Sequence, residues 1–127
     1  MNVPRAILWL TAAGFLGFGL AFALWPAPMI TYIDIQLPTA TARADFAATY
    51  GGLELGIGIF LMVCANRADW LEPGLWAATA ALAGFAVVRL ISVIFASNPV
   101  NSVIYGALAI EITGTLANLW AARQVRR

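Results

Sequence analysis

Four long apolar runs constrain this chain more than any other feature of its sequence. They cover residues 5–25, 44–65, 74–96 and 101–123, and each meets the ~20 helical residues that a bilayer core of about 30 Å requires. Proline marks every break between the runs: Pro26, Pro28, Pro73 and Pro99. The sequence therefore predicts an all-α integral membrane protein in one domain, residues 1–127, folded as a four-helix bundle of two antiparallel hairpins.

Composition supports the bilayer as the solvent of this chain. Of its 127 residues 62% are hydrophobic and 10% charged, which is too little polar surface to cover a water-soluble protein of this size. The net charge of +1 and the scattered arginines exclude a nucleic-acid partner, because binding to a phosphate backbone requires a dense basic surface.

The first run also has features of a cleaved signal peptide, since Arg5 precedes it and Ala21-Phe22-Ala23 resembles a cleavage site. Its apolar stretch is longer than a usual signal core. We therefore expect a membrane span over residues 5–25.

The arginines predict the orientation in the membrane. A cytoplasmic amino terminus places Arg5, Arg67, Arg123, Arg126 and Arg127 on the cytoplasmic side and leaves only Arg43 in an outer connection. This asymmetry predicts that both termini face the cytoplasm.

The connection between the first two runs is longer than a simple turn. Residues 26–41 include the stretch Ile30 to Leu37, which is too short to span a bilayer and too apolar for a free loop. We expect it to lie along the outer membrane interface, where it either covers helix ends or acts as a lid over a cavity.

Three charged residues lie inside the apolar runs. At ~1.5 Å per residue, Glu54 and Glu111 fall roughly 15 Å below the outer boundary and Arg89 about 10 Å below it. An ionised group at a helix centre costs about 2.5–3.5 kcal/mol on insertion scales, so side chains of this kind face the interior of a bundle. The sequence therefore predicts an inward-facing Glu54, Arg89 and Glu111 cluster.

The cluster contains two carboxylates but only one guanidinium. Arg89 has five donors to divide between two carboxylates, and three ionised groups leave a formal charge of minus one. One carboxylate is therefore expected to carry a proton at neutral pH, and the sequence does not decide which.

Helical spacing adds polar neighbours to the cluster. Tyr50 lies one turn before Glu54, Ser92 one turn after Arg89, and Asn118 two turns after Glu111. Gly52 and Gly56 form a GxxxG pair, which is expected to mediate internal helix packing, with a homodimer seam as the alternative.

Familiar catalytic motifs do not occur in the sequence. It has no histidine, one cysteine (Cys64), and neither a nucleophile elbow nor a phosphate-binding loop, so we expect no metal site and no cofactor. An enzyme would have to use Glu, Arg, Tyr and Asn, as in the isomerisation of an apolar substrate.

Nearly the whole chain resembles a family of small bacterial four-span proteins known only as a domain of unknown function, DUF4345. The most specific segment is Tyr50 to Gly56, and the similarity extends over the stretches 5–10, 14–19, 38–43 and 48–56. The resemblance implies a multi-pass protein of the bacterial inner (plasma) membrane, in which Arg89 and Glu111 match charged positions of the later helices. It implies no activity.

Three functions are compatible with these residues. The cluster binds or transports a small amphipathic molecule or a proton-coupled solute, or it is an ionic clamp in an accessory or assembly subunit of a membrane complex. In the third hypothesis a membrane-embedded isomerase-type enzyme uses Tyr50, Glu54 and Glu111 for proton transfer. A cavity beside unpaired carboxylates favours the first and third hypotheses, and a dry, fully paired cluster favours the second.

Overall fold

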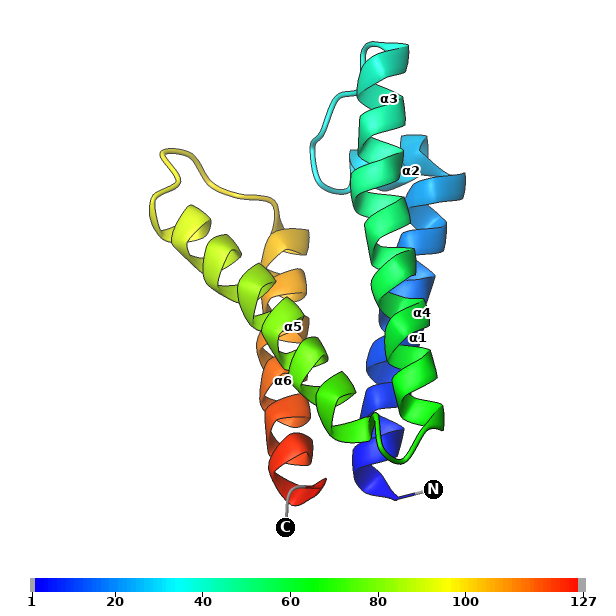
Figure 1. Ribbon diagram of the computed structural model, residues 1–127. Coiled ribbons are helices and arrows are strands. Elements are labelled where there is room, and N and C mark those ends of the chain that lie inside the picture. The colour runs from blue at the N-terminus through cyan, green and yellow to red at the C-terminus, as the bar shows by residue number, and fades with distance from the viewer. Residues whose placement is uncertain (1, 126–127) are drawn as a thin grey trace.

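The computed structural model describes residues 2–125 and consists of helices and their connections (Figure 1). Four helices are long and apolar enough to cross a membrane, which confirms the predicted all-α membrane bundle. The elements are α1 (Val3–Leu24), α2 (Pro26–Thr31), α3 (Ala40–Phe46), the π-helix η1 (Ala47–Gly52), α4 (Leu53–Asn66), α5 (Leu71–Ile94) and α6 (Ser102–Val125).

The second membrane helix is composite. The elements α3, η1 and α4 follow one another without a break, so that one helix of 27 residues runs from Ala40 to Asn66. It begins four residues before the predicted boundary at residue 44, because the Thr39 side chain accepts a hydrogen bond from the backbone N–H of Ala42 at 3.1 Å and so caps the helix.

The boundaries of the other membrane helices lie within three residues of those expected. The amino terminus of α1 is capped by Asn2, whose side chain accepts from the N–H of Arg5 at 3.2 Å. Helix α5 starts at Leu71, ahead of the predicted residue 74, because Pro73 fits the first helical turn, where no backbone N–H is needed.

The long helices pair as two hairpins. Helix α1 packs along η1 and α4, and α5 packs along α6. Both ends of the described chain lie at the same end of the bundle, here named the terminal end, and the connections 25–39 and 95–101 lie at the opposite, distal end (Figure 1).

Helix α1 approaches the composite helix closely. A Cβ atom added to Gly19 would lie 2.7 Å from the backbone nitrogen of Leu55, and one added to Gly51 would lie 2.8 Å from the nitrogen of Ala23. Small residues allow such backbone contact between membrane helices, where packing replaces the hydrophobic driving force.

The GxxxG pair does not mediate internal packing. A Cβ atom on Gly56 would meet nothing within 4 Å, and one on Gly52 would only reach the carbonyl of Ala47 at 4.0 Å. This expectation was wrong because α1 packs against the helix face that carries Gly51 and Gly58, while Gly52 and Gly56 lie on another face.

The core lies toward the terminal end, where both hairpins meet. Its fully buried side chains come from all four long helices: Leu8, Ala12, Leu61, Cys64, Ala65, Leu75, Ala78, Ala121 and Ala122. Cys64 is a packing residue there.

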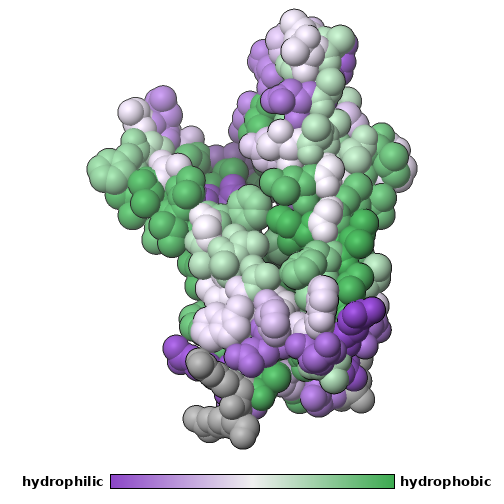
Figure 2. All heavy atoms as spheres, in the orientation of Figure 1, coloured by the Kyte–Doolittle hydropathy of each residue, from purple (hydrophilic) through white to green (hydrophobic). Residues whose placement is uncertain are grey.

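Toward the distal end the two hairpins separate, because α5 and α6 diverge from α1 and α3, and we call the separated parts the two arms (Figure 1). The surface between the arms is hollowed, and hydrophilic residues lie at the bottom of the hollow (Figure 2). We refer to this hollow as the distal cleft.

The connection 25–39 links the two arms at the distal end. After the short helix α2, Asp34 adopts a left-handed conformation with φ 56°, which Asp tolerates better than most residues. Asn101, at the start of α6, donates through Nδ2 to the Tyr32 carbonyl and to Asp34 Oδ2, both at 3.0 Å. The predicted apolar segment is therefore tethered to the second hairpin.

Candidate functional site

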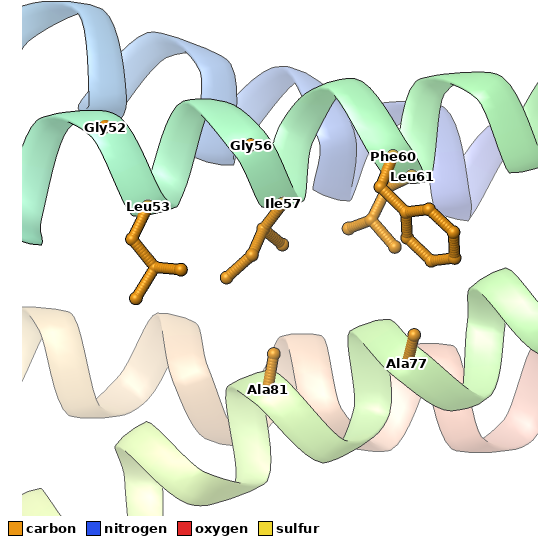
Figure 3. A pocket seen from close by; sticks show the side chains of 8 residues that line it. All are labelled: Gly52, Leu53, Gly56, Ile57, Phe60, Leu61, Ala77 and Ala81. Atoms are coloured by element: carbon orange, nitrogen blue, oxygen red, sulfur yellow. The ribbon is translucent and has the colours of Figure 1, made fainter.

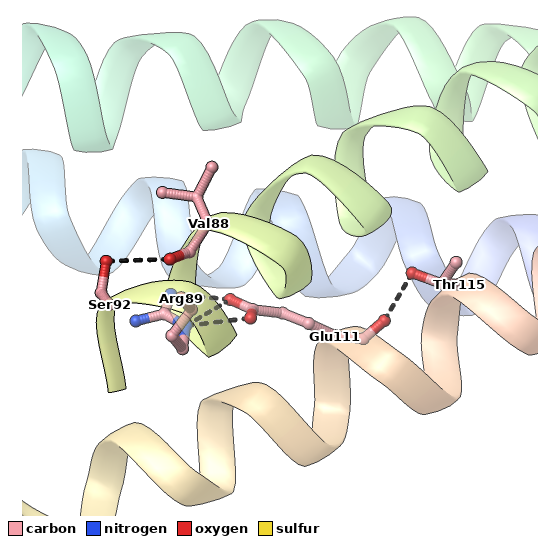
Figure 4. A network of polar contacts seen from close by, with 5 residues as sticks. All are labelled: Val88, Arg89, Ser92, Glu111 and Thr115. Atoms are coloured by element: carbon pink, nitrogen blue, oxygen red, sulfur yellow. Dashed lines mark hydrogen bonds and ion pairs between the residues drawn. The ribbon is translucent and has the colours of Figure 1, made fainter. Parts of the chain in front are cut away.

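Arg89 and Glu111 form an ion pair between α5 and α6 (Figure 4). Arg89 Nε donates to both carboxylate oxygens of Glu111 at 2.9 Å, and Nη2 donates to Oε1 at 2.6 Å. Charge-assisted bonds in this arrangement are about twice as strong as neutral ones. The pair joins the two helices of the second hairpin.

The two partners differ in exposure. The side chain of Glu111 is 10% exposed, whereas that of Arg89 is 28% exposed. Thr115 Oγ1 donates to the main-chain carbonyl of Glu111 at 2.7 Å, one turn further along α6 (Figure 4). Glu111 is therefore enclosed, and Arg89 keeps part of its guanidinium accessible. Within residues 2–125 no hydrogen bond occupies Arg89 Nη1.

Glu54 stands apart from this ion pair. It lies in the first turn of α4, and its Oε2 is buried without a hydrogen-bond partner among the described residues. The charge of Arg89 still acts on Glu54, so the two groups are within range of a Coulomb interaction. Arg89 does not divide its donors between two carboxylates as the sequence suggested, because α6 packs tightly beside α5 whereas α4 diverges from both toward the distal end.

The π-helix η1 precedes Glu54 directly. A π-helical turn is wider than an α-helical one, is rare, and often occurs at functional sites. It carries Tyr50, which is 40% exposed. The Tyr50 ring stacks on Phe46 at a centroid distance of 4.6 Å and lies 5.8 Å from Phe22. These three rings therefore form an aromatic cluster, in which Tyr50 lies one helical turn before Glu54.

Two other residues predicted from helical spacing lie outside this group. Ser92 donates through Oγ to the Val88 carbonyl at 2.8 Å, so its hydroxyl hydrogen bonds within α5 and not to the charged residues (Figure 4). Asn118 is fully buried and donates through Nδ2 to Thr11 Oγ1 and to the Gly114 carbonyl, both at 2.9 Å. It connects α6 to α1 toward the terminal end.

An apolar groove begins at the depth of Glu54. It has a volume of about 370 Å³ and lies between the composite helix and α5, where Leu53, Ile57 and Phe60 project toward Ala77 and Ala81 (Figure 3). Its length from Gly52 to Leu61 is about 14 Å at 1.5 Å per residue. Neither Glu54 nor Arg89 lines it, but Glu54 directly follows the lining residue Leu53. Within residues 2–125 no three carboxylates, cysteines or histidines are grouped to hold a metal ion.

The sequence analysis missed Thr11 and the Asn101–Asp34 contact. The sequence did contain a signal for Thr11. Thr11 lies eight residues after the start of α1, about 12 Å from the terminal end of the bundle, and Asn118 lies seven residues before the end of α6, about 10 Å from the same end. Two isolated polar residues at one depth in adjacent spans are expected to pair. The Asn101–Asp34 contact gives no such signal, because it depends on the path of a connection.

Comparison with known proteins places the chain in one family. Searches of curated proteins and of solved structures give no match. A family model described as Domain of unknown function (DUF4345) matches residues 3–122. That match covers all four membrane helices except the last residues of α6, so the chain is a member of the DUF4345 family of membrane proteins.

Proposed function

We propose that this protein binds a small amphipathic molecule between its two hairpins, with the polar group of the molecule at Glu54 and Arg89, and releases or transports it through the distal cleft. The observation that carries the proposal is the Oε2 atom of Glu54, which is buried without a hydrogen-bond partner among residues 2–125, while Arg89 directs its hydrogen bonds to Glu111. A group of this kind is costly inside a membrane, and intramembrane charges that are retained usually serve a substrate or an ion.

The surroundings of Glu54 support an amphipathic ligand. Hydrophilic residues lie at the bottom of the distal cleft (Figure 2), and the apolar groove includes Leu53, the residue that directly precedes Glu54. Binding sites for small molecules combine an apolar wall with a few polar groups and have volumes of about 300–1,000 Å³. The groove volume of about 370 Å³ falls in this range.

The connection 25–39, which links the two arms, supports the proposal that access of a ligand to the distal cleft is controlled. Residues Tyr32 and Asp34 are held to Asn101 by two hydrogen bonds of 3.0 Å at the distal end, where the cleft opens. Breaking these bonds frees the connection from the second hairpin. The connection therefore acts as a lid over the cleft.

The arginine distribution supports a place for the protein in the bacterial inner membrane with both termini in the cytoplasm. Arg5, Arg67 and Arg123 belong to the terminal end of the bundle, and Arg43 belongs to the distal end. Arg126 and Arg127 lie outside the described residues. In this orientation the distal cleft faces the periplasm.

A second candidate function is that of an accessory or assembly subunit. The Arg89–Glu111 pair favours it, because a charge-assisted pair between neighbouring helices is suited to fix their register. In that case the lipid-facing surface binds another membrane protein, and Glu54 has no ligand.

A comparison of two matched variants tests the proposal. Glu54→Gln and Glu111→Gln make the same chemical change in neighbouring carboxylates, and their melting temperatures in mild detergent are measured from pH 5 to 9. We expect Glu111→Gln to melt well below wild type, because it leaves Arg89 unpaired. Glu54→Gln is expected to melt at or above wild type, since it removes an unpaired group that is retained at the expense of stability.

The reverse pattern contradicts the proposal. If Glu54→Gln destabilises the protein as much as Glu111→Gln does, then Glu54 contributes to folding and the accessory-subunit function is favoured. Asp45→Asn serves as the control for a change in net charge, because Asp45 is exposed on α3.

A further inference from the structure

We infer that the polar group recognised at Glu54 is an organic cation, which forms an ion pair with the Glu54 carboxylate. The inference rests on the proposed function and assigns the chemical class of its ligand. It depends on the division of charge in the cluster, the groups that surround Glu54, and the aromatic rings next to it.

The cluster lacks one positive charge. Arg89 and Glu111 neutralise each other through three hydrogen bonds, so an ionised Glu54 leaves a net charge of minus one. A bound anion would bring the net charge of the cluster to minus two. The guanidinium of Arg89, which already pairs with Glu111, does not offset the energetic cost of that charge. A bound monovalent cation brings it to zero and supplies a partner for the Oε2 atom that has none among residues 2–125.

The elements around Glu54 provide no other cation for this role. Helix α1 packs along α4 but carries its one ionisable residue, Arg5, at the opposite end. The element η1 contributes the neutral hydroxyl of Tyr50, and α5 contributes Arg89, which pairs with Glu111 of α6. Arg43 and Asp45 lie on α3, two or more turns further toward the distal end.

Aromatic and apolar surfaces next to the carboxylate favour an organic cation over a metal ion. Tyr50, Phe46 and Phe22 form the aromatic cluster described above, and the groove of about 370 Å³ extends from the level of Glu54 between α4 and α5. Aromatic rings attract cations through their negative faces, and quaternary ammonium groups are recognised in this way. Phe22 and Phe46 are buried, so Tyr50, 40% exposed, offers the accessible ring, and Leu53 of the groove directly precedes Glu54 in the chain.

Protons compete with the cation for Glu54. Protonation of the carboxylate removes the charge that attracts the cation, so the affinity is expected to fall as the pH is lowered. In a membrane this exchange of one cation for one proton would couple movement of the ligand to a proton gradient.

Two probes of the same shape and opposite charge test the inference. Tetraphenylphosphonium and tetraphenylborate are measured by equilibrium dialysis against purified full-length protein in mild detergent, with protein-free micelles subtracted. The variants are Glu54→Gln, which removes the charge, Glu54→Asp, which retains it, and the exposed control Asp45→Asn. We expect wild type and Asp45→Asn to bind the phosphonium equally, Glu54→Asp to retain part of the affinity, and Glu54→Gln to lose about tenfold or more, equivalent to ~1.4 kcal/mol.

The outcomes separate this inference from the proposed function. One outcome is that wild type binds the borate in preference to the phosphonium and that Arg89→Gln abolishes this binding. The ligand is then an anion, so the inference of a cationic ligand is wrong, but the proposed site for an amphipathic molecule still holds. The cation is also excluded if Glu54→Gln binds the phosphonium as tightly as wild type. If neither probe binds above the micelle background, the cation and the proposed amphiphile site both fail.

Discussion

Arg89 donates three hydrogen bonds to Glu111 at 2.6–2.9 Å, while one carboxylate oxygen of Glu54 is buried nearby with no partner in the described chain. The two glutamates therefore differ in kind, although both lie in the middle of an apolar span. Glu111 is a partner in a helix contact, and Glu54 is the residue at which we propose that a ligand binds.

The Arg89–Glu111 pair should contribute strongly to stability. Arg89→Gln leaves the buried charge of Glu111 without its partner, and we expect a loss of roughly 3 kcal/mol in the free energy of unfolding. Glu111→Gln should cost less, because the Arg89 side chain that it leaves unpaired is 28% exposed. The double variant should lose less than the sum of the two, because no buried charge remains. Unfolding in mixed micelles measures all three free energies, and simple additivity would contradict direct coupling.

The contact between Asn118 and Thr11 should also be coupled. Thr11→Val keeps the side-chain shape but removes the acceptor for Asn118 Nδ2, at an expected cost of about 0.5–2 kcal/mol. Adding Asn118→Leu should restore part of this loss, because it removes the buried amide together with its Oδ1, which has no hydrogen-bond partner in the described part of the chain. A double variant that is less stable than Thr11→Val alone would be the opposite result.

Close packing of α1 against α4 predicts contrasting effects at two glycines of α1. Gly19→Ala places a methyl group 2.7 Å from the Leu55 nitrogen and should cost about 1–3 kcal/mol. Gly17→Ala meets nothing within 4 Å and should be neutral or slightly stabilising, since Ala is the better helix former. The melting temperatures of the two variants check this difference, and equal values would mean that α1 is not in backbone contact with α4.

The lid should open when its contact to α6 is broken. Asn101→Asp keeps the side-chain oxygen that accepts from the Val103 N–H at 3.0 Å, but it places a carboxylate against Asp34. We expect a hydrophilic maleimide to label a Glu54→Cys residue several-fold faster in this variant, on a Cys64→Ala background. Cys64 itself is fully buried and should label slowly in the wild-type protein, which supplies the control. Unchanged labelling of Glu54→Cys would show that the connection does not limit access.

The predicted orientation can be tested at the exposed ends of the helices. Single cysteines at Asn66 and Ser97, again with Cys64→Ala, are treated with a membrane-impermeant thiol reagent in intact cells. Reaction at Ser97→Cys and protection of Asn66→Cys is the expected pattern for a cytoplasmic terminal end. The inverse pattern would place the distal cleft on the cytoplasmic side.

The sequence by itself determined the solvent, the number of long helices and the pairing of neighbouring helices. Four runs of about 20 apolar residues leave a chain few alternatives to helices in a bilayer, because every backbone hydrogen bond has to be satisfied within the segment. The short connections 67–70 and 95–101 then force neighbouring helices to lie antiparallel. The same argument places Glu54, Arg89 and Glu111 at similar depths, since depth follows from the rise per residue.

Only the tertiary structure decided which of these charges are in contact. Depth along a helix is a local property, but the partner of Arg89 depends on how far apart the helices lie at that depth. The contact of α5 with α6 brings Glu111 to Arg89, while the divergence of the two hairpins leaves Oε2 of Glu54 without a hydrogen-bond partner among residues 2–125. The difference between Glu111, which pairs with Arg89, and Glu54, which does not, is thus a result of helix packing. The periodicity of apolar residues along the sequence does not predict that packing.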